Sequence, residues 1–215
     1  TFFIVVNATR AAFSRELDAW CAVQLFHYVA AGAGEIAPGA RQARTALRER
    51  LGVQRPFWKC FDYFLHALAA DGYLRLEGDD LVWLRAGRDV PAVERGREAL
   101  LARYPEFKGI VRLVEHCTSH YGDALSGKIK AITVLYPEGR SDLLEEPAKE
   151  NARHTNKAVY IRLLKETIER RLAAAGGRPL RILEVGVGNG LLASEIAPGR
   201  KGRNVEYVAT DLSRA

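Results

Sequence analysis

The stretch RILEVGVGNGLL, from Arg181 to Leu192, constrains the fold of this chain more than any other segment. It opens with an aliphatic run that hardly alternates with polar residues, which predicts a strand buried on both faces of a parallel sheet. Gly186, Gly188 and Gly190 follow, and LLASEIA then has the pattern of a helix. This order predicts a nucleotide-binding crossover, because glycines let a ligand approach the backbone at the carboxyl edge of a sheet.

The spacing of the glycines narrows the class of ligand. A dinucleotide fingerprint needs a third glycine three residues after its second, and Leu191 occupies that position. The segment is also not a P-loop, because no Gly-Lys-Ser/Thr follows it. A second apolar run, VEYVAT, ends at Asp211, where an acid would meet a ribose diol. The alternative interpretation is a structural glycine turn followed by an acid by chance.

The pattern Glu184-x-Gly186-x-Gly188-x-Gly190, followed by Asp211, resembles motif I of the class I S-adenosylmethionine-dependent methyltransferases. The resemblance implies S-adenosylmethionine as cofactor, with Glu184 at its methionine end and the three glycines beneath it. It also implies that Asp211 accepts hydrogen bonds from the ribose hydroxyls and that Leu212 borders the adenine. This cofactor carries a sulfonium and an ammonium but no pyrophosphate, so an acid beside the loop suits it.

The preceding segments are similar in their order to the carbon methyltransferase domains of polyketide synthases. They are EHCTSHYGDALSGKIKAITVLYPEG, a helix containing Asn156 and Tyr160, and RPLRILEVGVGNG. The resemblance implies methylation of the α-carbon of a malonyl or β-ketoacyl group on an acyl carrier protein. The implied partners are that carrier protein, with its phosphopantetheine-tethered acyl substrate, and neighbouring polyketide synthase domains. Asn189 stands where this family more often has Thr.

No catalytic base is assigned within these 215 residues. The resemblance implies that the base, the remaining strands and the metal ligands of a loading-module subgroup come after Ala215. Two other functions stay open: a small-molecule O-methyltransferase, and a non-catalytic pseudo-methyltransferase that serves as a scaffold in a megasynthase.

The first part of the chain has the order of elements of a winged-helix module. We expect a short strand, three helices and a hairpin over residues 1–7, 8–31, 38–52, 56–72 and 73–85. The helix before the hairpin offers Lys59 and otherwise mainly aromatic and aliphatic side chains, which suit burial better than a DNA groove. Nucleic acid is therefore not an expected partner.

Helices are also expected over residues 91–120 and 156–175, with a loop between them that Pro137, Gly139 and Pro147 punctuate. The predicted fold class is α/β. A mainly helical amino-terminal lid with a winged-helix-like part spans residues 1–150, and a connecting helix spans 151–177. Residues 178–215 form the first βαβ crossover of a Rossmann-like methyltransferase sheet.

Charge and hydropathy are those of an ordinary globular protein. The formal net charge of +6 is modest and spread along the chain, and it suits an acidic carrier domain or a phosphate-bearing arm. The sequence shows no signal peptide and no apolar run of the roughly 20 residues that a membrane span needs. We therefore expect a cytoplasmic protein that does not bind membranes.

The cysteines and histidines offer one weak metal motif. Cys21, Cys60 and Cys117 are odd in number and far apart, which favours reduced thiols over disulfides. His116 and His120 share a helix face beside Cys117, at a spacing that metal ligands can use. Partly buried histidines on a packed helix are the favoured interpretation, so no metal site is predicted.

Overall fold

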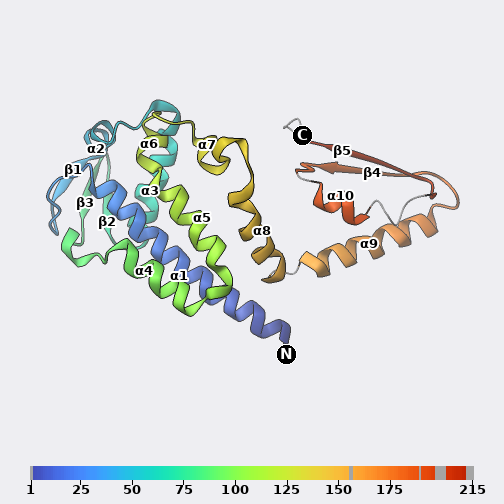
Figure 1. Ribbon diagram of the computed structural model, residues 1–215. Coiled ribbons are helices and arrows are strands. Elements are labelled where there is room, and N and C mark those ends of the chain that lie inside the picture. Colours follow the sequence, from blue (N-terminus) through green and yellow to red (C-terminus); the bar gives the residue numbers. More distant parts are fainter. Residues whose placement is uncertain (1, 155–156, 189, 197–201, 212–215) are drawn as a thin grey trace. The chain divides into compact units, whose positions relative to one another are not determined.

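The computed structural model describes residues 2–154, 157–188, 190–196 and 202–211. The chain forms two compact units, Thr1–His154 and Thr155–Ala215 (Figure 1). Together they make a mixed α/β protein that is mostly helical and contains two small sheets.

The first unit begins with a long helix followed by a small antiparallel sheet and two helices. Its elements in chain order are α1 (Phe2–Ala30), β1 (Arg41–Ala43), α2 (Arg44–Arg50), a 3₁₀ turn η1 (Arg55–Phe57), α3 (Trp58–Ala70), β2 (Leu74–Glu77) and β3 (Asp80–Trp83). The strands lie in the order β1-β3-β2, so the predicted hairpin is present as β2 and β3. The short strand β1 pairs with the outer side of β3 and widens the hairpin to three strands.

Two predictions for this region are wrong. The strand expected over residues 1–7 is not formed where the structure describes this segment, because residues 2–7 belong to α1. A short apolar run fits a strand or a buried helix equally well, and here no helix breaker separates it from the amphipathic helix that follows. The helix expected from about Pro38 begins only at Arg44, because Arg41–Ala43 pair with β3 instead.

The rest of the first unit is helical. It contains a 3₁₀ turn η2 (Gly87–Asp89), α4 (Val93–Arg103), η3 (Pro105–Phe107), α5 (Lys108–Ser119), α6 (Tyr121–Leu125), α7 (Ala131–Leu135), η4 (Pro137–Gly139) and α8 (Asp142–His154). The helix expected over residues 91–120 is interrupted at Tyr104, the residue before Pro105, where a proline disfavours helical backbone.

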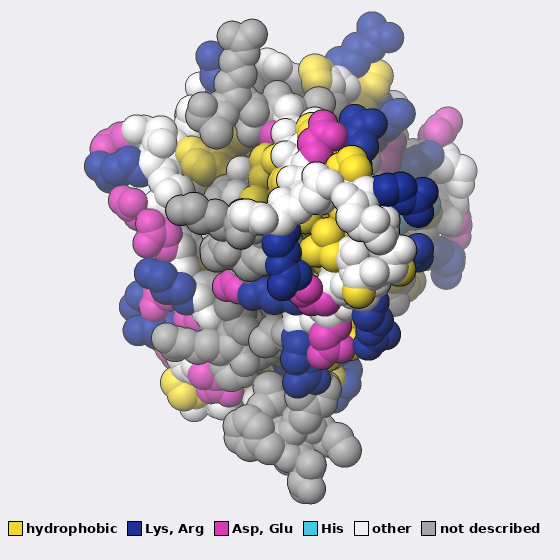
Figure 2. Space-filling view, turned by 90° about the vertical axis from the view of Figure 1, so that its right-hand side faces the viewer, with side chains coloured by type: hydrophobic (Ala, Val, Ile, Leu, Met, Phe, Trp, Pro, Cys, Tyr) yellow, Lys and Arg dark blue, Asp and Glu magenta, His cyan; other side chains and the backbone are white. Residues whose placement is uncertain are grey.

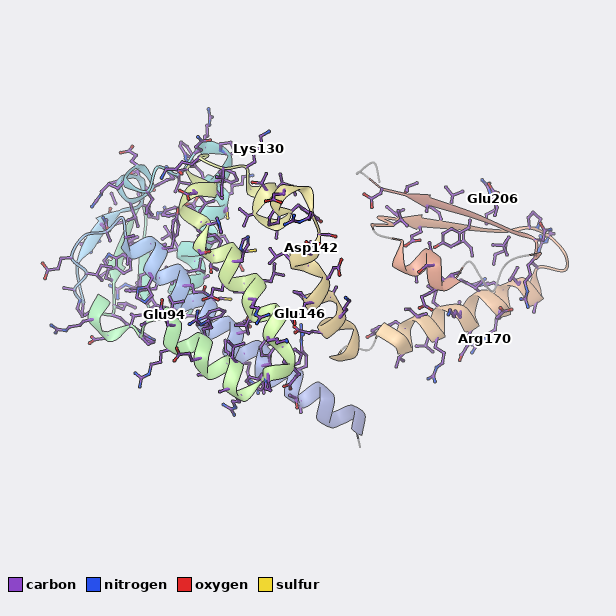
Figure 3. All side chains as sticks on the ribbon, in the orientation of Figure 1. Glu94, Lys130, Asp142, Glu146, Arg170 and Glu206 are labelled. Carbon is purple, nitrogen blue, oxygen red and sulfur yellow. The ribbon has the colours of Figure 1, made fainter. Side chains whose placement is uncertain are left out.

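The loop predicted before residue 156 is also wrong, because most of it is helical. Helix α8 contains Pro147, which removes one backbone hydrogen bond from a helix. The helix also contacts α5 through Glu146, which Figure 3 labels: Lys108 and Arg112 lie 3.3 and 3.5 Å from its carboxylate. The buried carboxylate of Glu150 also accepts hydrogen bonds from the first N–H groups of α5.

Two hydrophobic clusters hold the first unit together. The larger joins α1 and α3 to the sheet through side chains such as Phe26, Leu65 and Trp83. The smaller joins α1 to η3 and α5 and is centred on Phe13 and Phe107, whose rings stack at 4.2 Å between centroids. Both phenylalanines are fully buried.

The second unit contains α9 (Lys157–Ala174), β4 (Leu180–Val185), α10 (Leu191–Ile196) and β5 (Val205–Thr210). As predicted, β4 and β5 are parallel and a helix follows the glycine turn. Ile168 of α9 and Ile196 of α10 are buried, and Lys165 forms a 3.0 Å ion pair with Glu195 between these two helices.

Burial of β4 on both faces is not observed within the described residues. Leu183 and Val185 are 66% and 78% exposed, whereas the alternate residues of the strand are half-buried. The exposed face also carries an ion pair between Arg181 and Glu206 of β5, the second of which is labelled in Figure 3. Figure 2 shows one face of the molecule, on which hydrophobic side chains lie between charged ones.

Among the helices that the structure describes, none combines the length and the apolar character needed to cross a bilayer.

Candidate functional site

The loop between β4 and α10 holds its three glycines in left-handed backbone conformations. Gly186, Gly188 and Gly190 have φ angles of +79°, +54° and +73°. Residues with a Cβ adopt such angles at a cost of about 1–2 kcal/mol each. Among the residues that the structure describes, no atom lies within 4 Å of a Cβ built on any of the three. The backbone therefore requires glycine for its conformation, and no described side chain fills the space beside it.

The end of β5 anchors this glycine loop. The carbonyl oxygen of Thr210 accepts hydrogen bonds from the N–H groups of Gly186 (2.8 Å) and Val187 (3.0 Å). Gly190 donates to the carbonyl of Val187 at 2.9 Å, and Ser194 donates to the carbonyl of Gly190 at 2.8 Å, which begins α10. These bonds fix the loop at the carboxyl edge of the sheet, as the sequence predicts for a nucleotide site.

Asp211 lies directly against the glycine loop. Its Oδ2 accepts a 2.7 Å hydrogen bond from the N–H of Gly188. The sequence predicted that the glycines and this acid serve one site, and the structure brings them together. Leu212, the predicted neighbour of an adenine, lies outside the described residues.

Glu184 has a partner that the sequence analysis missed. The hydroxyl of Tyr207 donates a 2.5 Å hydrogen bond to Oε2 of Glu184. The phenol is protonated at neutral pH even with its ordinary pKa of 10.0, and burial and the nearby carboxylate raise this pKa further, to about 12. The only sequence signal for this contact was a tyrosine, Tyr207, within the apolar run VEYVAT. Its relation to Glu184 depends on the register of the two strands, which pairs Tyr207 with Ile182.

The histidines considered as metal ligands make other contacts. His116 Nε2 lies 2.9 Å from the carbonyl oxygen of Val134, and His120 Nδ1 lies 2.7 Å from that of His116. Within the part of the chain that the structure describes, no group of three or more His, Cys, Asp or Glu side chains could hold a metal ion. Cys21, Cys60 and Cys117 are free thiols, as predicted.

The chemistry of the loop follows from these groups. Carboxylates from the ends of both strands border it, and an ionised carboxylate only accepts hydrogen bonds. Such a site attracts cations and hydroxyl donors and repels anions, because like charges at close range are unfavourable. The arrangement suits a nucleoside with an ammonium group better than a pyrophosphate.

No family model matches the chain. It is 31% identical over 157 residues to polyketide synthase PksM of Bacillus subtilis (strain 168), covering 69% of the chain and 4% of that protein. It is 30% identical over 160 residues to the non-reducing polyketide synthase AC of Didymella fabae, covering 72% of the chain and 6% of that protein.

A solved structure is similar along almost the whole chain. The crystal structure of the DszA carbon methyltransferase matches with a TM-score of 0.79 and 29% sequence identity over 96% of this chain. The match covers 54% of the DszA chain, so this chain spans about half of that domain and a small part of the two synthases. The chain belongs to the carbon methyltransferase domains of polyketide synthases.

Proposed function

We propose that this chain forms part of an S-adenosylmethionine-dependent carbon methyltransferase. The enzyme would methylate the α-carbon of a malonyl or β-ketoacyl group on an acyl carrier protein. The observation that carries the proposal is the hydrogen bond between Gly188 and Asp211, which places an acid on a three-glycine loop. This hydrogen bond occurs in a chain that belongs to the carbon methyltransferase domains of polyketide synthases.

The described residues fit the proposed cofactor. Glu184 offers a carboxylate to the ammonium of its methionine end, and Asp211 offers acceptors to the ribose hydroxyls. No described atom lies within 4 Å of a Cβ built on Gly186, Gly188 or Gly190, which supports close approach of the nucleoside to this backbone. We keep Leu212 as the proposed neighbour of the adenine. When bound, S-adenosylmethionine supplies an electrophilic methyl group, and these residues bind and orient it.

We assign the start of the cofactor-binding core to residues 178–215, the connection, which contains the helix α9, to 151–177, and the lid on the substrate side to 1–150. The net charge of +6 supports an acidic carrier protein with its phosphopantetheine arm as partner. No catalytic base is assigned to His116 or His120, because hydrogen bonding to backbone carbonyls gives both rings a structural role.

Calorimetric titration of S-adenosylmethionine into the full-length protein tests the cofactor site. We expect micromolar binding that Asp211→Ala abolishes. The matched control is Asp142→Ala, which removes an exposed aspartate of α8 and should bind as the wild type does. Wild-type affinity in Asp211→Ala would remove this residue from the site. A folded wild type that does not bind would favour the non-catalytic scaffold.

The acceptor atom is tested separately by incubating the protein with malonyl- or β-ketoacyl-carrier protein and the cofactor. A methyl group attached to the α-carbon, identified by NMR of the released acid, is the expected product. An O-methyl product, or transfer only to a free small molecule, would favour the O-methyltransferase alternative.

A further inference from the structure

Tyr207 makes the only hydrogen bond to the Glu184 side chain that the structure records among the described residues. The bond joins Tyr207 Oη to Glu184 Oε2 at 2.5 Å, and no described donor reaches Oε1. A hydrogen bond to an ionised group is short and roughly twice as strong as one between neutral groups. The phenol therefore fixes one oxygen of this carboxylate and leaves the other available for a ligand.

The sheet places the two side chains on one face. Because the parallel register pairs Tyr207 with Ile182, and Ile182 and Glu184 are two residues apart, both side chains project to the same side. That face is half-buried, as are Ile182, Glu184 and Tyr207 themselves. The Glu184 side chain could adopt several rotamers, and the hydrogen bond from Tyr207 favours one of them. The position of Tyr207 is in turn set by β5, the strand that carries it.

The protonation state of Tyr207 favours its hydrogen bond to Glu184 at neutral pH. The phenol of Tyr207 keeps its proton at neutral pH, and its pKa is raised further above the ordinary value, so the residue is a donor to the carboxylate and not a second anion beside it. The main-chain carbonyl of Glu184 also accepts a 3.1 Å hydrogen bond from Thr210 Oγ1, so β5 holds the main chain of Glu184 as well as its side chain.

We propose that Tyr207 is a positioning residue that orients Glu184 toward the α-ammonium group of the cofactor's amino-acid end. It thereby makes the site selective for nucleosides that carry this end. The proposal rests on the cofactor site proposed above. Tyr207 does not touch the transferred methyl group in this role, and it acts through Glu184.

Two probes separate positioning from a general structural effect. S-adenosylhomocysteine carries the amino-acid end, whereas 5′-methylthioadenosine has the same nucleoside and thioether without the ammonium and carboxylate. Calorimetric titration of both into the full-length protein should show that Tyr207→Phe weakens S-adenosylhomocysteine about tenfold, as expected for the loss of about 1.4 kcal/mol. Its affinity for 5′-methylthioadenosine should stay within about twofold of the wild type.

Three variants complete the design. Tyr160→Phe removes the hydroxyl of a tyrosine that is 66% exposed on α9 and should leave both affinities unchanged. Asp211→Asn should weaken both probes, because both carry the ribose. Glu184→Gln should weaken S-adenosylhomocysteine selectively, and adding Tyr207→Phe to it should cause little further loss, because the phenol acts through this carboxylate.

Each outcome decides a different claim. Equal weakening of both probes by Tyr207→Phe, or no weakening of either, would overturn the positioning role while the cofactor site stands. Full additivity of the two substitutions would also overturn it. A folded wild type that binds neither probe would overturn the cofactor site, and the positioning role with it.

Discussion

The N–H of Gly188 donates a 2.7 Å hydrogen bond to Oδ2 of Asp211, 23 residues further along the chain. This bond joins the middle of the glycine loop to the end of the neighbouring strand. The carbonyl oxygen of Thr210 also accepts hydrogen bonds from the N–H groups of Gly186 and Val187, so the first half of the loop is bonded to the end of β5. The two halves of the proposed cofactor site therefore depend on each other for their positions.

Gly188→Ala should lower both stability and affinity for S-adenosylmethionine. The left-handed φ of +54° predicts a loss of about 1–2 kcal/mol in unfolding free energy. The added methyl group also enters space that the proposed cofactor would occupy, so affinity should fall more than tenfold. Chemical denaturation and calorimetric titration measure the two effects.

Gly176→Ala is the matched control for that substitution. Gly176 has a φ of +57°, and a Cβ on it would likewise meet no atom within 4 Å. It should lose similar stability and retain the wild-type affinity. Equal losses of affinity in the two variants would mean that backbone strain, and not the site, explains the effect of Gly188→Ala.

Glu150→Ala should destabilise the first unit by about 1.5–3 kcal/mol. The carboxylate is 5% exposed and accepts hydrogen bonds from the N–H groups of Gly109 (2.8 Å) and Ile110 (2.9 Å). Its removal leaves two buried donors at the start of α5 without their acceptor and removes a negative charge from a helix N-terminus. Urea unfolding should show the loss, whereas Glu145→Ala, at an exposed position of α8, should change stability by less than about 0.5 kcal/mol.

Phe13→Ala should destabilise the first unit by about 3–5 kcal/mol. Phe13 is fully buried and stacks on Phe107, so truncation removes apolar burial and leaves a cavity in the smaller cluster. Tyr63→Ala, at a side chain that is 68% exposed, should have a much smaller effect on urea unfolding. Similar losses in the two variants would contradict the packing described for this cluster.

Cys21 should make stability fall at alkaline pH. Burial, reinforced by nearby Asp18, raises the pKa of its thiol from 9.0 to about 11. Above pH 9 the unfolded thiol loses its proton while the folded one retains it, so this contribution is present below pH 9 and is lost toward pH 11. Urea unfolding at pH 8 and pH 10.5 should show a smaller decline in Cys21→Ser than in the wild type. An identical decline would show that other groups cause it.

The glycine loop and the acid beside it could be predicted from the sequence because their signals are local. The glycines follow a strand directly, and their conformation depends on their own lack of a Cβ, so Gly186, Gly188 and Gly190 could be recognised without tertiary information. The acid at Asp211 ends a second apolar run of the same kind. Tyr207 could not be recognised in this way, because its contact with Glu184 depends on how two strands align.

The errors in the fold lie where local and tertiary preferences compete. The apolar residues 1–7 suit a strand locally, yet α1 continues through this segment up to Phe2. Residues 41–43 pair with β3 and so leave the helix that was expected there. Pro147 disfavours a helix locally, whereas the ion pairs and the Glu150 cap between α8 and α5 stabilise one.

The sequence by itself determined the parallel crossover, the glycine loop, the acid that follows the second strand and the hairpin of the first unit. Each of these depends on backbone freedom or on hydrophobic periodicity within a few residues. Only the tertiary structure decided that β1 joins the sheet, that Glu150 caps α5 and that Tyr207 holds Glu184. Those contacts join residues 23 to 41 positions apart, and their free energies depend on packing that no short window of sequence contains.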